Sequence, residues 1–221
     1  MKTIVVEFVG LPGCGKSTVA DIVRSRLNEL GYKVGSDKNI YDNNIIVSGI
    51  KLLISFINPG NHRFNSQLRK TLTVVIDHKN FLYTLKRYFK IVKLNGNINR
   101  ERKKYDYLIL SEGYLQVYSS IFDNAKMKNE SIHNYWINID KNMWRCFTID
   151  INEKIASKRI LLRGERNDEW YFMDMNTRKK NLHRRSANIN RIVDNIDTSI
   201  LDGNKSPDII SEEVITILEE L

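Results

Sequence analysis

The chain has 221 residues, 42% of them hydrophobic and 28% charged, with a formal net charge of +9. This length suits one well-packed domain and is short for two, so we expect a single domain over residues 1–221. The cysteines, Cys14 and Cys146, do not form the pattern of a disulfide framework, and the scattered histidines give no zinc spacing. The excess positive charge indicates an anionic ligand, either the phosphates of a small molecule or a nucleic-acid backbone.

The first apolar segment, Ile4 to Val9, is too short for a signal peptide. No later segment approaches the ~20 apolar residues of a membrane span, so we expect a cytoplasmic protein without a membrane partner. The segment has apolar residues at both odd and even positions, which is typical of a central parallel strand buried on both faces. Apolar residues at helical spacing follow from Val19 to Leu30, and Gly31 is the expected C-terminal cap of that helix.

The middle of the chain predicts a helical region between strands. Residues 32–35 are expected to form a short second strand. The region 41–104 reads as mostly helical, and we assign it to the acceptor side of the site. Residues 107–110 are fully apolar and predict another buried strand, which Glu112 and Gly113 end with a carboxylate and a turn residue.

The last third of the chain continues this alternation. Residues 146–151 predict a strand, and Asp150 at its end is the expected cap of the following helix. The polar segment 163–177 is the candidate lid. The other expected elements are helices at 155–162, 178–196 and 207–221 and an edge strand at 198–201. The alternation predicts an α/β three-layer fold of the P-loop NTPase type, with a parallel sheet of about five strands flanked by helices and an arginine-bearing lid.

A specific motif joins the first strand to the first helix. The segment Gly10-Leu11-Pro12-Gly13-Cys14-Gly15-Lys16-Ser17 matches G-x-x-x-x-G-K-[ST]. Its glycines let the backbone N–H groups of Gly13, Cys14 and Gly15 reach phosphate oxygens without a Cβ in the way. The helix that follows directs its positive end at the same oxygens. The motif therefore predicts a nucleoside triphosphate site.

The first residues of that helix have their own expected contacts. Lys16 is expected to bridge the β- and γ-phosphates and to act in catalysis. The Ser17 hydroxyl is expected to bind magnesium, and Thr18 to contact the α-phosphate. The cofactors predicted from the motif are ATP, or a related triphosphate, and Mg²⁺.

The segment Phe8 to Thr18 resembles the start of nucleoside and nucleotide kinases, and the order of elements is similar to the thymidylate kinase-like group of P-loop kinases. Residues 108–114 resemble the strand that in this group ends in an acidic residue beside the magnesium and the acceptor. Residues 149–164 resemble the strand, helix and arginine-bearing lid. The resemblance implies phosphoryl transfer and a homodimer. Thymidylate kinases usually carry Asp-Arg where this chain has Glu112-Gly113, and that arginine contacts the phosphate of the acceptor.

The arginines near the candidate lid suit a strongly anionic transition state. Arg163 is the favoured catalytic arginine, and Arg159 and Arg166 are candidate nucleotide-binding residues. A closing lid that brings them to the phosphates would also exclude water. The alternative is a solvated basic helix whose arginines pair with acidic residues of the same segment.

Two carboxylates are candidates for handling the acceptor. Glu112 stands at the carboxyl end of a buried strand, where ligands bind in open parallel sheets, and could hold magnesium or accept the proton of an attacking hydroxyl. Asp37 follows the expected second strand and could orient or deprotonate the acceptor. The alternatives are a salt bridge at the rim for Glu112 and an ordinary turn for Asp37.

The preferred function is therefore a kinase for a nucleotide, a nucleoside or a sugar-like metabolite. Basic residues between Lys86 and Lys104 leave a 5′-hydroxyl nucleic-acid kinase as an alternative, but a solvated helix face is the favoured interpretation of these charges. A nucleotide-dependent switch or ATPase is the other alternative. Residues 204–207 begin like a guanine-reading Asn-Lys-x-Asp loop but carry Pro207 at the Asp position, which argues against a GTPase.

Overall fold

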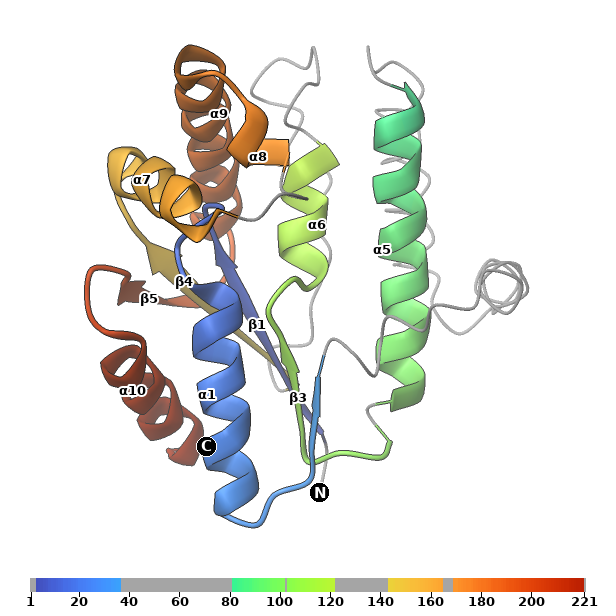
Figure 1. Cartoon of the computed structure of the whole chain (residues 1–221). Helices are drawn as coiled ribbons and strands as arrows, with labels where there is room; N and C mark the ends of the chain where they lie inside the picture. The colour runs from blue at the N-terminus through green and yellow to red at the C-terminus, as the bar shows by residue number, and fades with distance from the viewer. Residues whose placement is uncertain (1–2, 37–80, 102, 122–142, 165–168, 221) are drawn as a thin grey trace.

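The computed structural model describes residues 3–36, 81–101, 103–121, 143–164 and 169–220. Its strands form one parallel sheet in the order β2-β3-β1-β4-β5 (Figure 1). The strands are β1 (Ile4–Gly10), β2 (Val34–Ser36), β3 (Tyr107–Leu110), β4 (Trp144–Asp150) and β5 (Thr198–Asp202). The expected central position of the first strand and the edge position of the last are confirmed.

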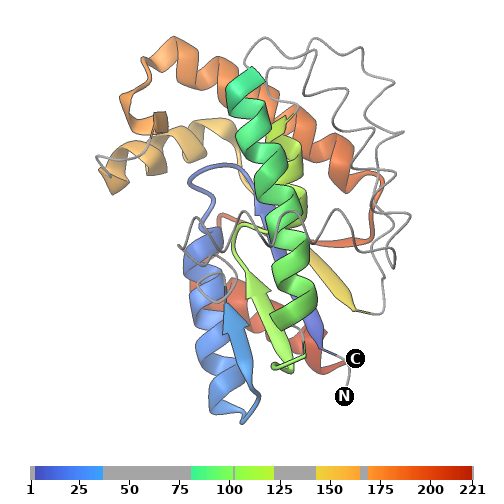
Figure 2. The same cartoon turned by 90° about the vertical axis from the view of Figure 1, so that its right-hand side faces the viewer.

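Helices cover both faces of the sheet, which gives the predicted three layers (Figure 2). The helices are α1 (Lys16–Glu29), α5 (Phe81–Glu101), α6 (Tyr114–Ile121), α7 (Glu153–Arg163), α8 (Glu169–Phe172), α9 (Met175–Val193) and α10 (Pro207–Glu219). On one face α1 packs against α10, and on the other α6 packs against both α5 and α9. The sheet is thereby enclosed, as parallel sheets require.

Burial follows the apolar pattern of the strands. All of β3 is buried, and β1 is buried from Val5 onward. Phe8 on β1 stacks on Phe147 of β4, with ring centroids 5.8 Å apart. Burial of each such side chain contributes about 1.5–3 kcal/mol, so these central strands form a rigid base for the loops at their carboxyl ends. Glu7 is the charged exception within β1, and it is also fully buried.

The helix ends are set by local chemistry that the sequence shows only in part. Gly31 follows α1 with φ 90°, as expected for a C-terminal cap. The prediction that Asp150 caps the next helix is wrong, because β4 runs through Asp150, which lies opposite Asp202 in the sheet. The cap is Asn152, whose side chain accepts a hydrogen bond from the Lys154 N–H at 2.8 Å.

The candidate lid is partly helical. Residues 169–172 form α8, and α9 begins at Met175, inside the segment predicted as the lid, because Asp174 caps it by accepting a hydrogen bond from the Thr177 N–H. The buried Arg178 side chain donates to the carbonyls of Trp170, Tyr171 and Met173. This guanidinium fixes α8 to the start of α9.

Several predictions fall on residues that the structure does not describe. Most of the acceptor region 41–104 lies outside the described residues, except for α5 and the turn that follows it, and α5 is helical as expected. The candidates Asp37 and Arg166 also lie outside them. Within the described residues, no helix combines the length and apolarity that a membrane crossing requires.

Candidate active site

The loop between β1 and α1 has a backbone that depends on its glycines. Gly13 has φ 80° and Gly15 has φ 101°, conformations that residues with a side chain rarely adopt. A Cβ on Gly13 would also lie 2.9 Å from the Ala156 carbonyl oxygen of α7. Gly15 is the N-cap residue of α1, and among the described residues no side chain caps the helix there. The first N–H groups of α1 are therefore available to an anion.

The Lys16 ammonium lies over this loop. It donates hydrogen bonds to the carbonyl oxygens of Gly10 and Leu11, each at 2.9 Å, and lies 3.6 Å from the Cys14 sulfur. An ammonium group has three donors and a flexible stem. Its charge is thus held within the loop that the motif assigns to phosphates.

The other residues of the motif differ in how far their side chains are exposed to solvent. Ser17 and Thr18 are exposed in the first turn of α1, so solvent reaches both side chains. The Cys14 side chain is buried in the core, and its N–H donates to the Leu11 carbonyl at 3.2 Å. Any contribution of Cys14 to ligand binding would therefore come from its backbone.

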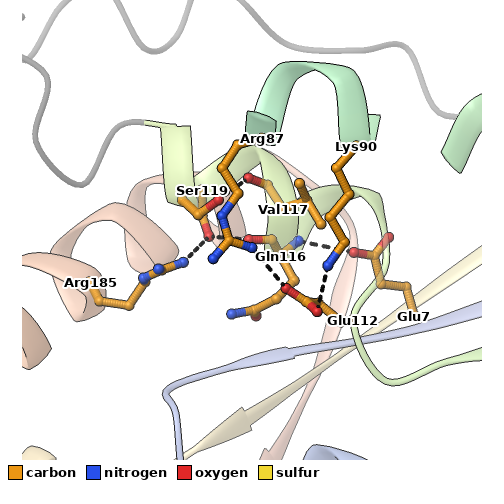
Figure 3. Close-up of polar contacts among 9 residues, drawn as sticks. Glu7, Arg87, Lys90, Glu112, Gln116, Val117, Ser119 and Arg185 are labelled. Atoms are coloured by element: carbon orange, nitrogen blue, oxygen red, sulfur yellow. Dashed lines mark hydrogen bonds and ion pairs between the residues drawn. The ribbon is translucent and has the colours of Figure 1, made fainter. Parts of the chain in front are cut away.

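Glu112 lies just beyond the carboxyl end of β3. Its Oε2 is 2.7 Å from Lys90 Nζ and its Oε1 is 3.4 Å from Arg87 Nη1, both on α5 (Figure 3). Burial raises the pKa of Glu112, but the charges of Lys90, Arg87 and Lys16 outweigh it and lower that pKa below its ordinary value. Glu112 is therefore anionic at neutral pH, and Lys16 lies near enough to influence it electrostatically.

The expectation of a solvated helix face is wrong for Arg87 and Lys90. The basic residues of this region were expected on a solvated helix face, yet these two side chains are only partly exposed and point at Glu112. Arg87 also lies over the Tyr83 ring, with its guanidinium carbon 5.2 Å from the centroid. The face that α5 turns to α6 and Glu112 is set by tertiary packing, which the periodicity of the helix alone does not show.

Gly113 explains the departure from the thymidylate kinase pattern. A Cβ on Gly113 would lie 2.4 Å from Glu7 Cδ and 2.7 Å from Glu7 Oε1. No side chain can occupy that position while the Glu7 carboxyl stays in place. The arginine expected from the family pattern is thus excluded sterically by a residue that the sequence analysis did not single out. The signal for Glu7 was a lone acidic residue in an otherwise apolar strand.

The arginines of α7 differ in their placement. Ala156 and Ile160 pack against Gly13, so α7 lies directly beside the loop. Arg159 donates from Nη1 to the Gly203 carbonyl, 3.0 Å away, just after β5. Arg163 is exposed at the last position of α7. The structure therefore places Arg163 at the end of a helix that touches the loop, whereas the Arg159 guanidinium binds Gly203.

Helix α6 connects these parts. The Gln116 side-chain Oε1 accepts a hydrogen bond from the Gly10 N–H at 3.1 Å, and Arg185 of α9 donates to Ser119 Oγ at 3.3 Å. Figure 3 shows Glu112, Gln116 and Ser119 along this turn and helix, with Arg87 and Arg185 approaching from α5 and α9. Polar side chains from four elements therefore gather at the carboxyl edge of β1 and β3. Among the described residues, no group of acidic, histidine or cysteine side chains forms a preassembled metal site.

Comparison with known proteins places this geometry in a fold. No protein-family model matches the chain, and no curated protein matches it by sequence. The structure of deoxyadenosine kinase from M. mycoides with the products dCMP and a flexible dCDP matches with a TM-score of 0.59 at 13% identity, covering 99% of this chain and 100% of that one. The fold is that of the P-loop kinases.

Two further structures share the P-loop kinase fold. The same deoxyadenosine kinase with bound dATP has a TM-score of 0.56 at 12% identity and covers 98% of this chain and 100% of its own. Shikimate kinase from Bacteroides thetaiotaomicron has a TM-score of 0.50 at 11% identity, with 98% of each chain covered. These neighbours share the P-loop kinase architecture and do not single out the thymidylate kinase-like group.

Proposed function

We propose that the chain is an ATP-dependent phosphotransferase that moves the γ-phosphoryl group to a small-molecule acceptor, namely a nucleotide, a nucleoside or a sugar-like metabolite. The observation that carries the proposal is the loop after β1, in which positive-φ glycines, the start of α1 and Lys16 lie together. The P-loop kinase fold supports it, since the neighbours named above are kinases of small molecules.

The residues of the loop fit a magnesium-bound triphosphate. The N–H groups of Gly13 and Gly15, the start of α1 and the exposed Ser17 and Thr18 hydroxyls offer donors and a hard oxygen ligand. The Cys14 N–H would join them by exchanging the Leu11 carbonyl for a phosphate oxygen. When bound, the nucleotide supplies the phosphoryl group, and Mg²⁺ neutralises part of its charge. We assign to Lys16 an exchange of the Gly10 and Leu11 carbonyls for phosphate oxygens, because hydrogen bonds between charged partners are the stronger ones.

Glu112 is proposed to orient the acceptor or a cation rather than to remove a proton. A general base works best when its pKa lies near the operating pH. The pKa of Glu112 is lowered by Lys90, Arg87 and Lys16 in spite of burial, which makes it a weak base and a persistent anion. Asp37 therefore stays the alternative candidate for the base.

The lid arginines are proposed to complete the site. Arg163 ends α7, whose Ala156 and Ile160 pack against Gly13, and we assign to it a contact with the phosphates when the site closes on a nucleotide. Arg159 is proposed to contact the nucleotide or, through Gly203, to fix the end of β5 beside it. Arg166 keeps the nucleotide-binding role that the sequence suggests.

Three finer assignments complete the proposal. The resemblance of residues 8–18, 108–114 and 149–164 favours a place in the thymidylate kinase-like group. The proposed assembly is a homodimer, and the proposed location is the cytoplasm. Glycine at position 113 argues against thymidylate itself as the acceptor, because the arginine that contacts its phosphate in that group has no room here.

The test is consumption of ATP with Mg²⁺ across nucleosides, nucleoside monophosphates, sugars and short 5′-hydroxyl oligonucleotides. We expect one class of small molecules to stimulate consumption strongly and to appear as a phosphorylated product. Stimulation by oligonucleotides alone would replace the proposal with a nucleic-acid kinase. Slow hydrolysis that no compound stimulates would contradict it and favour a switch.

A further inference from the structure

The Glu7 carboxyl joins three elements beneath the candidate site. It is fully buried on β1. Its Oε1 accepts a hydrogen bond from the Gln116 N–H in the first turn of α6, at 3.1 Å, and its Oε2 accepts one from Trp144 Nε1 on β4, also at 3.1 Å. A carboxyl group suits the start of a helix, where N–H groups lack partners within the helix.

Gln116 extends this connection to the phosphate-binding loop. Its backbone N–H donates to Glu7 (Figure 3), while its side-chain Oε1 accepts from the Gly10 N–H at 3.1 Å. Gly10 is both the last residue of β1 and the first residue of the motif. The Gln116 side chain is 7% exposed, so water competes little for this bond. Helix α6 is thus fixed to the central strand at Glu7 and again at Gly10.

The turn that carries Glu112 is fixed by the same contacts. Gly113 packs so closely on the Glu7 carboxyl that it has no room for a Cβ, and Glu112 is the preceding residue. The loop that holds phosphates and the carboxylate opposite it are therefore both attached to one pair of side chains. A change in either attachment would alter the distance between Glu112 and the loop.

We propose that Glu7 and Gln116 are positioning residues for phosphoryl transfer, which hold α6 and Glu112 at a fixed distance from the phosphate-binding loop. The proposal rests on the kinase function proposed above. Both side chains are buried and form hydrogen bonds with other parts of the protein, so we assign them no contact with the reacting groups. They act through the alignment of the bound reactants, since a displacement of about 1 Å can cost on the order of 100-fold in rate.

This role predicts a separation of kinetic effects. Loss of the Gln116 acceptor releases the Gly10 N–H but leaves Lys16 and the start of α1 unchanged. We therefore expect kcat to fall by about 10-fold or more in Gln116→Met, with the Kd for ATP with Mg²⁺ within about 3-fold of the wild type. A residue that only stabilised the fold would lower the melting temperature without lowering kcat per folded molecule.

The experiment combines hydrogen exchange of the Gly10 amide with these kinetics in the full chain. Ser120→Ala is the matched control, because Ser120 is buried on the same helix and its hydroxyl donates within that helix, to the Val117 carbonyl. Gln116→Asn, which withdraws the acceptor oxygen by one methylene, is the second variant if Gln116→Met does not fold. We expect faster Gly10 exchange in the Gln116 variant and unchanged exchange in Ser120→Ala.

The outcomes separate this proposal from the proposed function. If the Gly10 amide exchanges as slowly in the Gln116 variant as in the wild type, the proposed attachment of Gln116 to Gly10 is overturned. If exchange is faster but kcat is undiminished, only the positioning role is overturned. A wild-type chain whose ATP consumption no acceptor stimulates would overturn the kinase function, and the positioning role with it. Faster exchange with reduced kcat and a retained Kd for ATP supports both.

Discussion

Lys90 Nζ lies 2.7 Å from Glu112 Oε2, so a cation from α5 meets the carboxylate at the end of β3. This contact ties α5 to the edge of the sheet where the loop after β1 begins. It also keeps Glu112 anionic, since Lys90 is the leading charge that lowers its pKa against the effect of burial.

Replacement of Lys90 should move the pH dependence of turnover. In Lys90→Met the pKa of Glu112 rises, because burial still favours the neutral acid while the main opposing charge is gone. If turnover requires anionic Glu112, the acidic limb of the kcat/KM profile shifts to higher pH. Lys86→Met is the control, because Lys86 is exposed on the same helix. An acidic limb that does not move in Lys90→Met would show that Glu112 does not control it.

A methyl group at position 113 should destabilise the fold through Glu7. Gly113→Ala places a Cβ 2.4 Å from Glu7 Cδ, and such overpacking costs about 1–3 kcal/mol in the free energy of unfolding. In a Glu7→Ala background the same substitution should cost less by about 1 kcal/mol or more. Gly164→Ala is the control for additivity, because its cost comes from the backbone conformation at φ 62° and not from Glu7, so it should be the same in both backgrounds. Equal costs of Gly113→Ala in both backgrounds, measured by urea unfolding, would contradict the contact.

Glu7 should make stability depend on pH in a defined window. Burial raises the pKa of Glu7 from 4.5 to about 8, against the N–H groups of α6 and the Trp144 indole, which lower it. Between these values the native chain keeps a proton that the unfolded chain releases, so the free energy of unfolding falls as pH rises. The slope from this group is at most about 1.4 kcal/mol per pH unit and vanishes below 4.5 and above about 8.

The comparison that isolates this effect is wild type against Glu7→Gln, which is neutral at every pH. Tyr114 and Cys146 face Glu7, and burial and the charge of Glu7 raise the pKa of each, so both stay neutral across the window. The difference in unfolding free energy should therefore change in favour of Glu7→Gln from pH 5 to pH 8. Parallel curves for the two proteins would mean that Glu7 keeps the same charge when the chain unfolds.

The sequence predicted the parts of the fold that local chemistry determines. The strand at 107–110 was predicted with its observed bounds, and Gly31 was expected to end the first helix, because buried strands and C-terminal caps leave short, direct signatures. The phosphate-binding loop was also evident, because its glycines and Lys16 have fixed spacing. The central position of the first strand and the edge position of the last were predicted, but the order of all five strands comes from the structure.

The rest depends on contacts between distant segments. Asp150 looked like a helix cap, but pairing with β5 extends the strand through it. Arg87 and Lys90 looked like part of a solvated face, because a helical pattern does not tell which side meets α6 and Glu112. Glu7 meets Gln116 109 positions away in the chain, and no spacing rule brings those two residues together.

The central claim is that Lys16 belongs to a phosphoryl-transfer site, and Lys16→Ala tests it most directly. The measurement is acceptor-dependent consumption of ATP with Mg²⁺, with Lys179→Ala, an exposed lysine of α9, as the control and circular dichroism to check the fold. We expect Lys16→Ala to lose about 100-fold or more in kcat while remaining folded, because a positive charge at the transition state is removed and no core side chain is changed. Near-normal turnover by folded Lys16→Ala would contradict it and place the active site elsewhere.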